Sequence, residues 1–235
     1  VDYLENLNVP AYKIASFEVI DLPLIEYVAS TNKPMIISTG MANEEEIEEA
    51  IEAARSGGCS ELAILHCVSG YPAPAEDYNL KTISHMRDKF GLVIGLSDHT
   101  LDNNTAIASV ALGASIIEKH FTLDRKGGGP DDSFSLEPSE MAELCKGANV
   151  AWSALGDINF SRKSSEEANV QFRRSLYFVK DMKSGDIISE DAVRSVRPGF
   201  GIPPKYLKDI IGQKIKHDVL KNTPVKNQSL EKPII

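Results

Sequence analysis

Apolar residues gather in five short runs along the first two thirds of the chain, and helical patterns separate the runs. The runs read AYKIASF, PMIISTG, LAILHC, LVIGLSDH and ASIIEKHF, at residues 11–17, 34–40, 62–67, 92–99 and 114–121. Nearly continuous apolar strands that alternate with helices are typical of a parallel sheet covered by helices. The spacing of roughly 25 to 30 residues corresponds to one βα unit, so the pattern predicts five such units.

The clearest helical pattern is NEEEIEEAIEAARSGG, which begins at Asn43. Asparagine is a typical N-cap residue, and the three glutamates after it lie in the first turn, where the helix dipole favours negative charge. Gly57 and Gly58 end the pattern, as glycines commonly end helices. A second long helix is predicted to begin near Pro138 and to run past Trp152.

Two architectures fit this alternation of strands and helices, an open doubly wound sheet and a (β/α)8 barrel. No glycine-rich dinucleotide fingerprint follows any of the apolar runs, which disfavours the open sheet. The runs instead end in polar residues, as in a barrel that builds its active site at the C-terminal ends of its strands. These residues are Lys13, Ser16, Ser38, Thr39, His66, Ser97, His99, Glu118 and His120. We therefore expect the last five units of a (β/α)8 TIM barrel, in a fragment whose first three strands precede Val1.

After the long helix, the sequence no longer alternates apolar strands with helices. Residues 1–155 form the predicted partial barrel domain, and the polar stretch GDINFSRKSSEEANVQF at 156–172 is predicted to be a linker. From 173 to 235, short β-like runs such as RSLYFVK and AVRSVRP alternate with turn signals such as KSGD and KNTP. This last segment predicts a small, separate, β-rich domain.

Composition and charge argue against some classes of function. The chain carries a net charge of −9 without a basic run, which argues against general nucleic-acid binding. A few local donors can still bind an anionic small substrate. The sequence has no apolar stretch as long as a membrane span, and no signal peptide is expected. Three widely spaced cysteines lack metal-binding spacing, so reduced thiols and a cytoplasmic location are expected.

Two histidines close consecutive predicted strands, His99 in GLSDHT and His120 in EKHF. A single histidine at a strand end is more often solvated or bonded to a backbone carbonyl. Side chains alternate along a strand, so Ser97 shares a face with His99, and Glu118 shares a face with His120. Adjacent parallel strands lie about 4.8 Å apart, so the two imidazoles can converge at one point. The pair indicates an open, catalytic type of metal site, completed by water and substrate.

At these motifs the chain resembles the sialic acid synthase family. The resemblance rests on YKIAS, STGM, HCVSGYPAP, GLSDHT, EKHFTLDR, GPDDSFSLEP and RPGFG, which occur in the family's order along essentially the whole chain. It implies a (β/α)8 barrel followed by a small antifreeze-like (SAF) domain. It also implies a transferase that condenses phosphoenolpyruvate with an open-chain amino sugar, giving a nine-carbon 2-keto acid and phosphate. A fragment without the upstream strands is expected to be inactive alone.

The resemblance also implies a role for individual residues. The residues expected to hold a divalent metal, Mn²⁺ or Mg²⁺, are His99 and His120. General ligand preference for two imidazoles would instead suggest zinc or iron. The residues expected to hold phosphoenolpyruvate are Lys13, Ser16 and Ser97. Those expected to contact the sugar are Glu18, Tyr71, Asp131 and Arg197. Glu118 is expected to act on protons or on water.

The expected assembly also follows from the resemblance. Arg197 is expected to reach from the antifreeze-like domain into the barrel of a second subunit, which implies a domain-swapped homodimer. A fully charged, planar guanidinium is suited to this reach, because it can bond a sugar amide oxygen in a fixed orientation. The alternative is a surface arginine that braces its own turn.

The run after GPD indicates a branch of the family. Synthases for neuraminic and legionaminic acids usually have His-Lys-Ala-Ser-like residues there, whereas this chain has Asp132, Ser133 and Phe134. Ser69 stands where asparagine is common in the neuraminic acid branch. These departures are similar to the pseudaminic acid branch, whose acceptor is 2,4-diacetamido-2,4,6-trideoxy-altrose. Two alternatives stay open: neuraminate or legionaminate synthesis with the same chemistry, and a non-catalytic partial barrel with a binding module.

Overall fold

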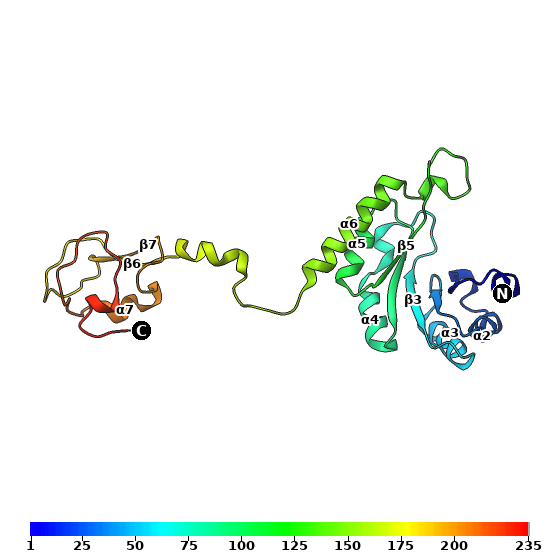
Figure 1. Cartoon of the computed structure of the whole chain (residues 1–235), viewed down its shortest axis with the longest axis horizontal. Helices are drawn as coiled ribbons and strands as arrows, with labels where there is room; N and C mark the ends of the chain where they lie inside the picture. Colours follow the sequence, from blue (N-terminus) through cyan, green and yellow to red (C-terminus); the bar gives the residue numbers. More distant parts are fainter. Residues whose placement is uncertain (235) are drawn as a thin grey trace. The chain divides into compact units, whose positions relative to one another are not determined.

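The computed structural model describes residues 1–234, which form two compact units, Val1–Asp157 and a second unit that begins at Ile158 (Figure 1). The first unit is built on one five-stranded parallel sheet with the order β1-β2-β3-β4-β5. Its strands are β1 (Tyr12–Ile14), β2 (Met35–Ser38), β3 (Leu62–Cys67), β4 (Val93–Asp98) and β5 (Ile116–Lys119). All five predicted strands are confirmed, and their sequential order is that of consecutive units of a TIM barrel.

Helices precede, connect and follow these strands. They are α1 (Asp2–Asn6), α2 (Leu22–Ala29), α3 (Glu44–Ser56), α4 (Lys81–Phe90), α5 (Asn104–Ala111) and α6 (Pro138–Leu155). In Figure 1, α2 lies beside α3 and α5 lies beside α6. Because βα connections are right-handed and every step along the sheet goes the same way, the connecting helices fall on one face of the sheet.

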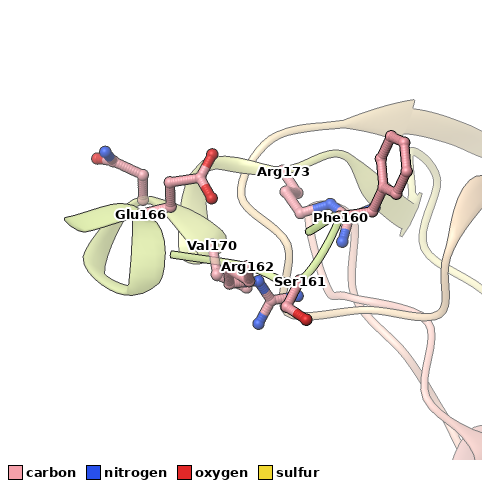
Figure 2. Close-up of a pocket in the computed structure, with 7 residues that line it drawn as sticks. Phe160, Ser161, Arg162, Glu166, Val170 and Arg173 are labelled. Carbon is pink, nitrogen blue, oxygen red and sulfur yellow. The ribbon is translucent and has the colours of Figure 1, made fainter. Parts of the chain in front are cut away.

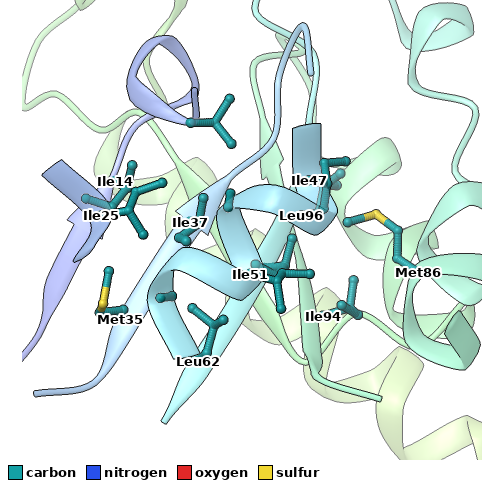
Figure 3. Close-up of a cluster of buried hydrophobic side chains, with 14 of the residues drawn as sticks. Ile14, Ile25, Met35, Ile37, Ile47, Ile51, Leu62, Met86, Ile94 and Leu96 are labelled. Atoms are coloured by element: carbon teal, nitrogen blue, oxygen red, sulfur yellow. The ribbon is translucent and has the colours of Figure 1, made fainter. Parts of the chain in front are cut away.

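Alternation along the strands separates a core face from a face that carries polar groups. Tyr12 and Ile14 of β1 are buried, whereas Lys13 between them is exposed. The core side chains of the strands pack against α2, α3 and α4, as Figure 3 shows for Ile25, Ile47 and their neighbours. The opposite face therefore carries the side chains from which a functional site can be built.

The predicted helix signals are confirmed in α3 and α6. The Asn43 side chain accepts a hydrogen bond from the Glu46 backbone, and the Glu46 carboxylate accepts one from the Asn43 backbone. This reciprocal capping box satisfies two backbone donors at the start of α3. The helix ends at the Gly57 C-cap, and Gly58 follows with a φ of +105°, which favours glycine. The second helix, α6, begins at Pro138, as predicted.

The second unit contains a small antiparallel sheet and several short turns of helix. Its elements are β6 (Ser175–Phe178), β7 (Val193–Val196), α7 (Leu207–Ile210) and the 3₁₀ helices Ser164–Phe172, Pro204–Tyr206 and Asn227–Ser229. Leu176 and Phe178 of β6 lie in its own apolar core with Ile188, Val225 and Leu230. The first of the 3₁₀ helices lies inside the polar stretch 156–172. Among the described residues, no helix has the length and hydrophobicity needed to cross a membrane.

Candidate active site

The register of β4 against β5 brings the two histidines to the same edge of the sheet. Ser97 lies opposite Glu118, and Asp98 lies opposite Lys119, the last residue of β5. His99 and His120 are therefore the next residues on their two strands. Their ring centroids lie 5.2 Å apart, with an angle of 63° between the ring planes.

His99 is held by its backbone and by one ring nitrogen. Its backbone N–H donates to the Tyr78 hydroxyl at 2.7 Å, and its carbonyl accepts from the Ala73 N–H at 3.1 Å. Its Nδ1 lies 2.8 Å from the Val68 carbonyl. The carbonyl can only accept, so Nδ1 carries the proton and Nε2 is the nitrogen available to a ligand.

His120 is more accessible and electrostatically suited to bind as a neutral imidazole. Burial and the neighbouring His99 lower the pKa of His120 below its ordinary value, against the opposing effect of Asp131 and Glu118. Its Nδ1 lies 3.6 Å from Asp131 Oδ2. A lowered pKa leaves the ring neutral near pH 7, which is the form that binds metals.

A three-residue polar cluster lies on the same face as the histidines. Glu118 Oε1 accepts hydrogen bonds from Lys13 Nζ and from Ser97 Oγ, both at 2.8 Å. Burial alone would raise the pKa of Glu118, but the bonds from Lys13 and Ser97 hold it below its ordinary value. The carboxylate is therefore ionised, and it fixes the lysine ammonium at the sheet edge.

Ser16, another predicted site residue, is buried beside a close approach of two loops. Its hydroxyl donates to Cys67 Sγ at 3.4 Å and accepts from the Gly40 N–H at 3.0 Å. A side chain at Gly40 would place its Cβ 2.8 Å from Ser16 Oγ and 2.2 Å from Ser69 Oγ. A larger residue at this position would therefore force both serine hydroxyls to move.

Cys67 lies beside two of the predicted site residues, Ser16 and His99, and hydrogen bonds with both. It lies opposite Ser97 in the β3–β4 register. Burial raises the pKa of the Cys67 thiol, but hydrogen bonds with His99 and Ser16 outweigh it and leave the pKa below its ordinary value. Burial lowers the pKa of His99, while Cys67 and the Val68 carbonyl raise it above the ordinary value on balance.

Ser38 is one of the polar strand-end residues, but the sequence prediction gave it no individual role. Within the described residues, its buried hydroxyl has no hydrogen-bond partner. Ser38 pairs with Leu65 of β3, which in turn pairs with Gly95 of β4. It therefore lies on the face that carries Ser97 and Glu118, where an unpartnered hydroxyl is available to a ligand.

Aromatic rings surround the histidines. The Tyr71 ring lies 4.3 Å from His99 and 5.8 Å from His120, centroid to centroid. The Phe134 ring lies 5.6 Å from Tyr71 and 5.2 Å from His120. The two rings form an apolar surface directly beside the polar cluster.

Two of the predicted sugar contacts, Glu18 and Arg197, have exposed side chains. Glu18 ends the 3₁₀ helix Ser16–Glu18, and its side chain is exposed. Arg197 follows β7 in the second unit, and its side chain is also exposed. A separate hollow of about 430 Å³ in the second unit contains none of the predicted site residues (Figure 2). Its lining includes Arg162 and Arg173.

The donor set fits one divalent ion. Nitrogen–metal bonds of about 2.0–2.2 Å from each ring are compatible with ring centroids 5.2 Å apart. Across residues 1–234, no three histidine, cysteine or acidic side chains are arranged to hold an ion together. If an ion binds at this position, the protein ligands that the two converging rings offer are His99 and His120, and water or substrate oxygens would complete its shell.

Known proteins share this arrangement of domains. Residues 1–160 match the NeuB family, and residues 173–231 match the SAF domain. The crystal structure of N-acetylneuraminic acid synthetase from Leptospira borgpetersenii, in complex with citrate, superposes with a TM-score of 0.67 at 34% identity. That superposition covers 72% of this chain and 59% of the other.

Two curated relatives are similar to this chain over most of its length. Pseudaminic acid synthase of Helicobacter pylori is 38% identical, over 100% of this chain and 69% of the relative. N,N'-Diacetyllegionaminic acid synthase of Campylobacter jejuni is 41% identical, over 91% of this chain and 65% of the relative. The chain thus spans about two thirds of the length of each, 69% and 65%. By its family match and these identities, the chain belongs to the NeuB family and carries a SAF domain after its barrel segment.

Proposed function

We propose that the full-length protein that carries this chain is a nonulosonic acid synthase. In this reaction C3 of phosphoenolpyruvate attacks the aldehyde carbon of an open-chain amino sugar, water adds to C2, and phosphate leaves with cleavage of its C–O bond. The synthase domain lies within residues 1–155, and residues 156–172 link it to the SAF domain at 173–235. The observation that carries the proposal is the convergence of His99 and His120 beside the Lys13–Glu118–Ser97 cluster.

Phosphoenolpyruvate binds at the polar cluster. Lys13 supplies a cation, and the hydroxyls of Ser16 and Ser97, which donate to Cys67 and Glu118 without substrate, turn to donate to it when it binds. Together these groups suit a phosphate dianion or a carboxylate. The buried hydroxyl of Ser38 on the same face, which has no partner among residues 1–234, adds a further donor. These groups hold one negatively charged substrate against the overall charge of −9.

His99 and His120 would hold the divalent ion, through Nε2 of His99 and a nitrogen of His120. When bound, the ion supplies a positive charge that stabilises the oxygen of the aldehyde as the C–C bond forms. Mn²⁺ or Mg²⁺ suits a shell completed by oxygen ligands, whereas zinc or iron is the alternative that imidazole preference favours.

Glu118 serves as the acid–base group of the cluster. Its carboxylate is ionised because Lys13 and Ser97 lower its pKa. It therefore accepts a proton from the water that adds to C2, and its bond to Lys13 keeps the ammonium beside the phosphate.

Tyr71, Phe134, Asp131 and Glu18 form the sugar side of the site. The acceptor is 2,4-diacetamido-2,4,6-trideoxy-altrose, the precursor of pseudaminic acid. Support comes from the apolar surface of Tyr71 and Phe134 beside His120, which suits the methyl group of a 6-deoxy sugar. The two curated relatives have similar identity and different products, so legionaminate synthesis is the second candidate.

The protein acts as a domain-swapped homodimer in the cytoplasm. The exposed side chain of Arg197 reaches the sugar in the barrel of a second subunit. The cytoplasmic location is supported by three free cysteines, Cys59, Cys67 and Cys145, since reducing compartments keep thiols free.

A competition assay tests the proposed acceptor. The full-length protein is given phosphoenolpyruvate with equal amounts of the pseudaminic acid precursor, the legionaminic acid precursor and N-acetylmannosamine, and the products are separated by mass and chromatography. The first acceptor is expected to have the highest kcat/KM, because the other two leave polar atoms unpaired. A comparable kcat/KM for N-acetylmannosamine contradicts the assignment of the branch.

A further inference from the structure

A buried ion pair lies directly behind the two histidines. Lys119 Nζ lies 2.9 Å from Asp98 Oδ2, and the two side chains are only 2% and 0% exposed. Asp98 stands between Ser97 and His99 in the sequence, and Lys119 stands between Glu118 and His120. Side chains alternate along a strand, so the ion pair points to the opposite face of the sheet from these site residues.

The pair is fully hydrogen bonded. Lys119 Nζ also donates to the carbonyls of Thr100 and Asp102, at 2.5 and 2.7 Å. The Asp98 carboxylate accepts from the Thr100 N–H at 2.9 Å and from the Thr100 hydroxyl at 3.1 Å. The pair thus ties the loop that carries His99 to the end of the strand that carries His120.

Stability alone does not explain such a pair. Removing two charges from water is unfavourable, and well-packed apolar residues often replace a buried ion pair without loss of stability. What the pair supplies is fixed geometry, since its bonds satisfy both charges only in one arrangement of the loop and the strand. Positioning is therefore the role that its chemistry favours.

The pair lies at the ends of both strands, directly before the two histidines. Asp98 and Lys119 are the last residues of β4 and β5, and they are register partners. Other bonds hold each histidine separately: the Tyr78 hydroxyl holds the backbone of His99, and the Leu136 N–H donates to the His120 carbonyl at 2.9 Å. The ion pair joins the two strands immediately before the histidines diverge from the sheet.

We propose that Asp98 and Lys119 are positioning residues that set the separation of His99 and His120 for metal binding. This inference rests on the proposed metal site and deepens it. A shift of one strand end against the other moves the two imidazole nitrogens apart, and groups that orient metal ligands typically change metal affinity by about 10- to 100-fold when removed.

The test measures Mn²⁺ affinity by electron paramagnetic resonance on the full-length protein, with thermal unfolding followed in parallel. The double variant Asp98→Asn/Lys119→Met removes both charges and leaves no single charge buried. It is expected to unfold cooperatively and to bind Mn²⁺ about 10- to 100-fold more weakly than the wild type. A wild-type Kd in the folded double variant overturns the proposal.

Two further variants separate the outcomes. Thr100→Val keeps both charges but removes the hydroxyl that bonds Asp98, and it is expected to weaken Mn²⁺ binding severalfold. If the double variant does not fold, an unchanged Kd in folded Thr100→Val overturns the proposal instead. Lys33→Met breaks the Lys33–Glu5 ion pair before β2 and is expected to leave the Kd unchanged. An equal loss of affinity in this control assigns the effect to general destabilisation and refutes positioning.

A failure of the proposed metal site is visible in the same experiment. His99→Ala in the otherwise unchanged chain is expected to abolish the Mn²⁺ signal. If wild type and His99→Ala bind Mn²⁺ equally, the metal site itself is wrong, and the positioning role falls with it. If only the Asp98 and Lys119 variants bind as the wild type does, the metal site stands and the positioning role is wrong.

Discussion

Lys13 and Glu118 are separated by 105 residues, yet Nζ and Oε1 of these side chains lie 2.8 Å apart. They belong to β1 and β5, the two edge strands of the five-stranded sheet. In a flat sheet, four steps of about 4.8 Å would place these strands about 19 Å apart. Side chains of this length cannot bridge that distance, so the sheet curls toward its polar face. The curl that begins a barrel is the same feature that assembles the site.

The first prediction concerns this pair. Lys13→Met in the full-length protein removes the cation of the proposed phosphoenolpyruvate site, and the KM for phosphoenolpyruvate is expected to rise at least about tenfold. The estimate follows from a charge-assisted hydrogen bond of about 1.5–3 kcal/mol. Steady-state kinetics with each substrate varied in turn measures the change. Lys33→Met is the matched control, because Lys33 pairs with Glu5 and lies outside the cluster. An unchanged KM in Lys13→Met would remove Lys13 from the substrate site.

The second prediction concerns the two histidines. His120→Ala in the full-length protein is expected to abolish turnover that is restored by metal after treatment with a chelator, since one ligand of the ion is lost. His85→Ala serves as the control, because its exposed ring lies near Glu44, on α3, outside the cluster. The measurement combines phosphate release with metal analysis of the purified proteins. Retained activity in His120→Ala with the metal still bound contradicts the proposed role.

The third prediction concerns Arg197. Arg197→Ala and His120→Ala subunits of the full-length protein are each expected to be inactive, and mixing them is expected to restore about a quarter of wild-type activity. Random exchange makes half of the dimers mixed, and each mixed dimer has one intact site of two. Restoration requires that Arg197 serve the partner's barrel. If exchange is verified by mass and no activity returns, Arg197 serves its own barrel or none.

A pH prediction follows from two carboxylates of the second unit. Asp218 accepts bonds from Lys183 Nζ at 2.8 Å and from the Ser184 N–H at 2.9 Å, and these partners lower its pKa below the ordinary value of 3.8. Lys180 and Ser189 likewise lower the pKa of Asp191. A lowered folded-state pKa gives stability that is present above the unfolded value and is lost as pH falls through the folded value. The free energy of unfolding of this unit is therefore expected to fall below about pH 3.8.

Urea unfolding of the whole chain, followed by the methyl NMR signals of Leu176 and Ile188, checks this dependence within the second unit. Asp218→Asn is expected to flatten the pH profile below about pH 3.8, whereas Glu190→Gln, at an exposed position, keeps the wild-type profile. A profile of Asp218→Asn that matches the wild type at every pH rules out the linkage.

Much of the first unit follows from the sequence pattern. Five apolar runs predict the five strands, and Asn43 with Gly57 predicts the limits of α3, because both signals act within a few residues. The convergence of His99 and His120 also follows, since alternation and strand spacing are fixed properties of parallel sheets.

Other features depend on contacts that no local pattern encodes. Cys67 resembles an ordinary core cysteine until the curled sheet brings it beside Ser16 and His99. The buried partners of Asp98 come from the next strand and from its own loop. The 3₁₀ helix Ser164–Phe172 forms from polar residues through local bonds such as Lys163 N–H to Glu166, which hydrophobic periodicity does not record.

The proposed condensation is tested most directly by following the bridging oxygen of phosphoenolpyruvate. The full-length protein is incubated with phosphoenolpyruvate labelled with ¹⁸O at the C2–O–P position, the diacetamido-trideoxy sugar and Mn²⁺. Mass spectrometry then locates the label in the products. The proposed condensation is expected to give a nine-carbon 2-keto acid without the label and phosphate that carries it. The two products are expected in equal amounts and only when the sugar is present. Label retained in the organic product, or phosphate released without the sugar, contradicts the proposed condensation.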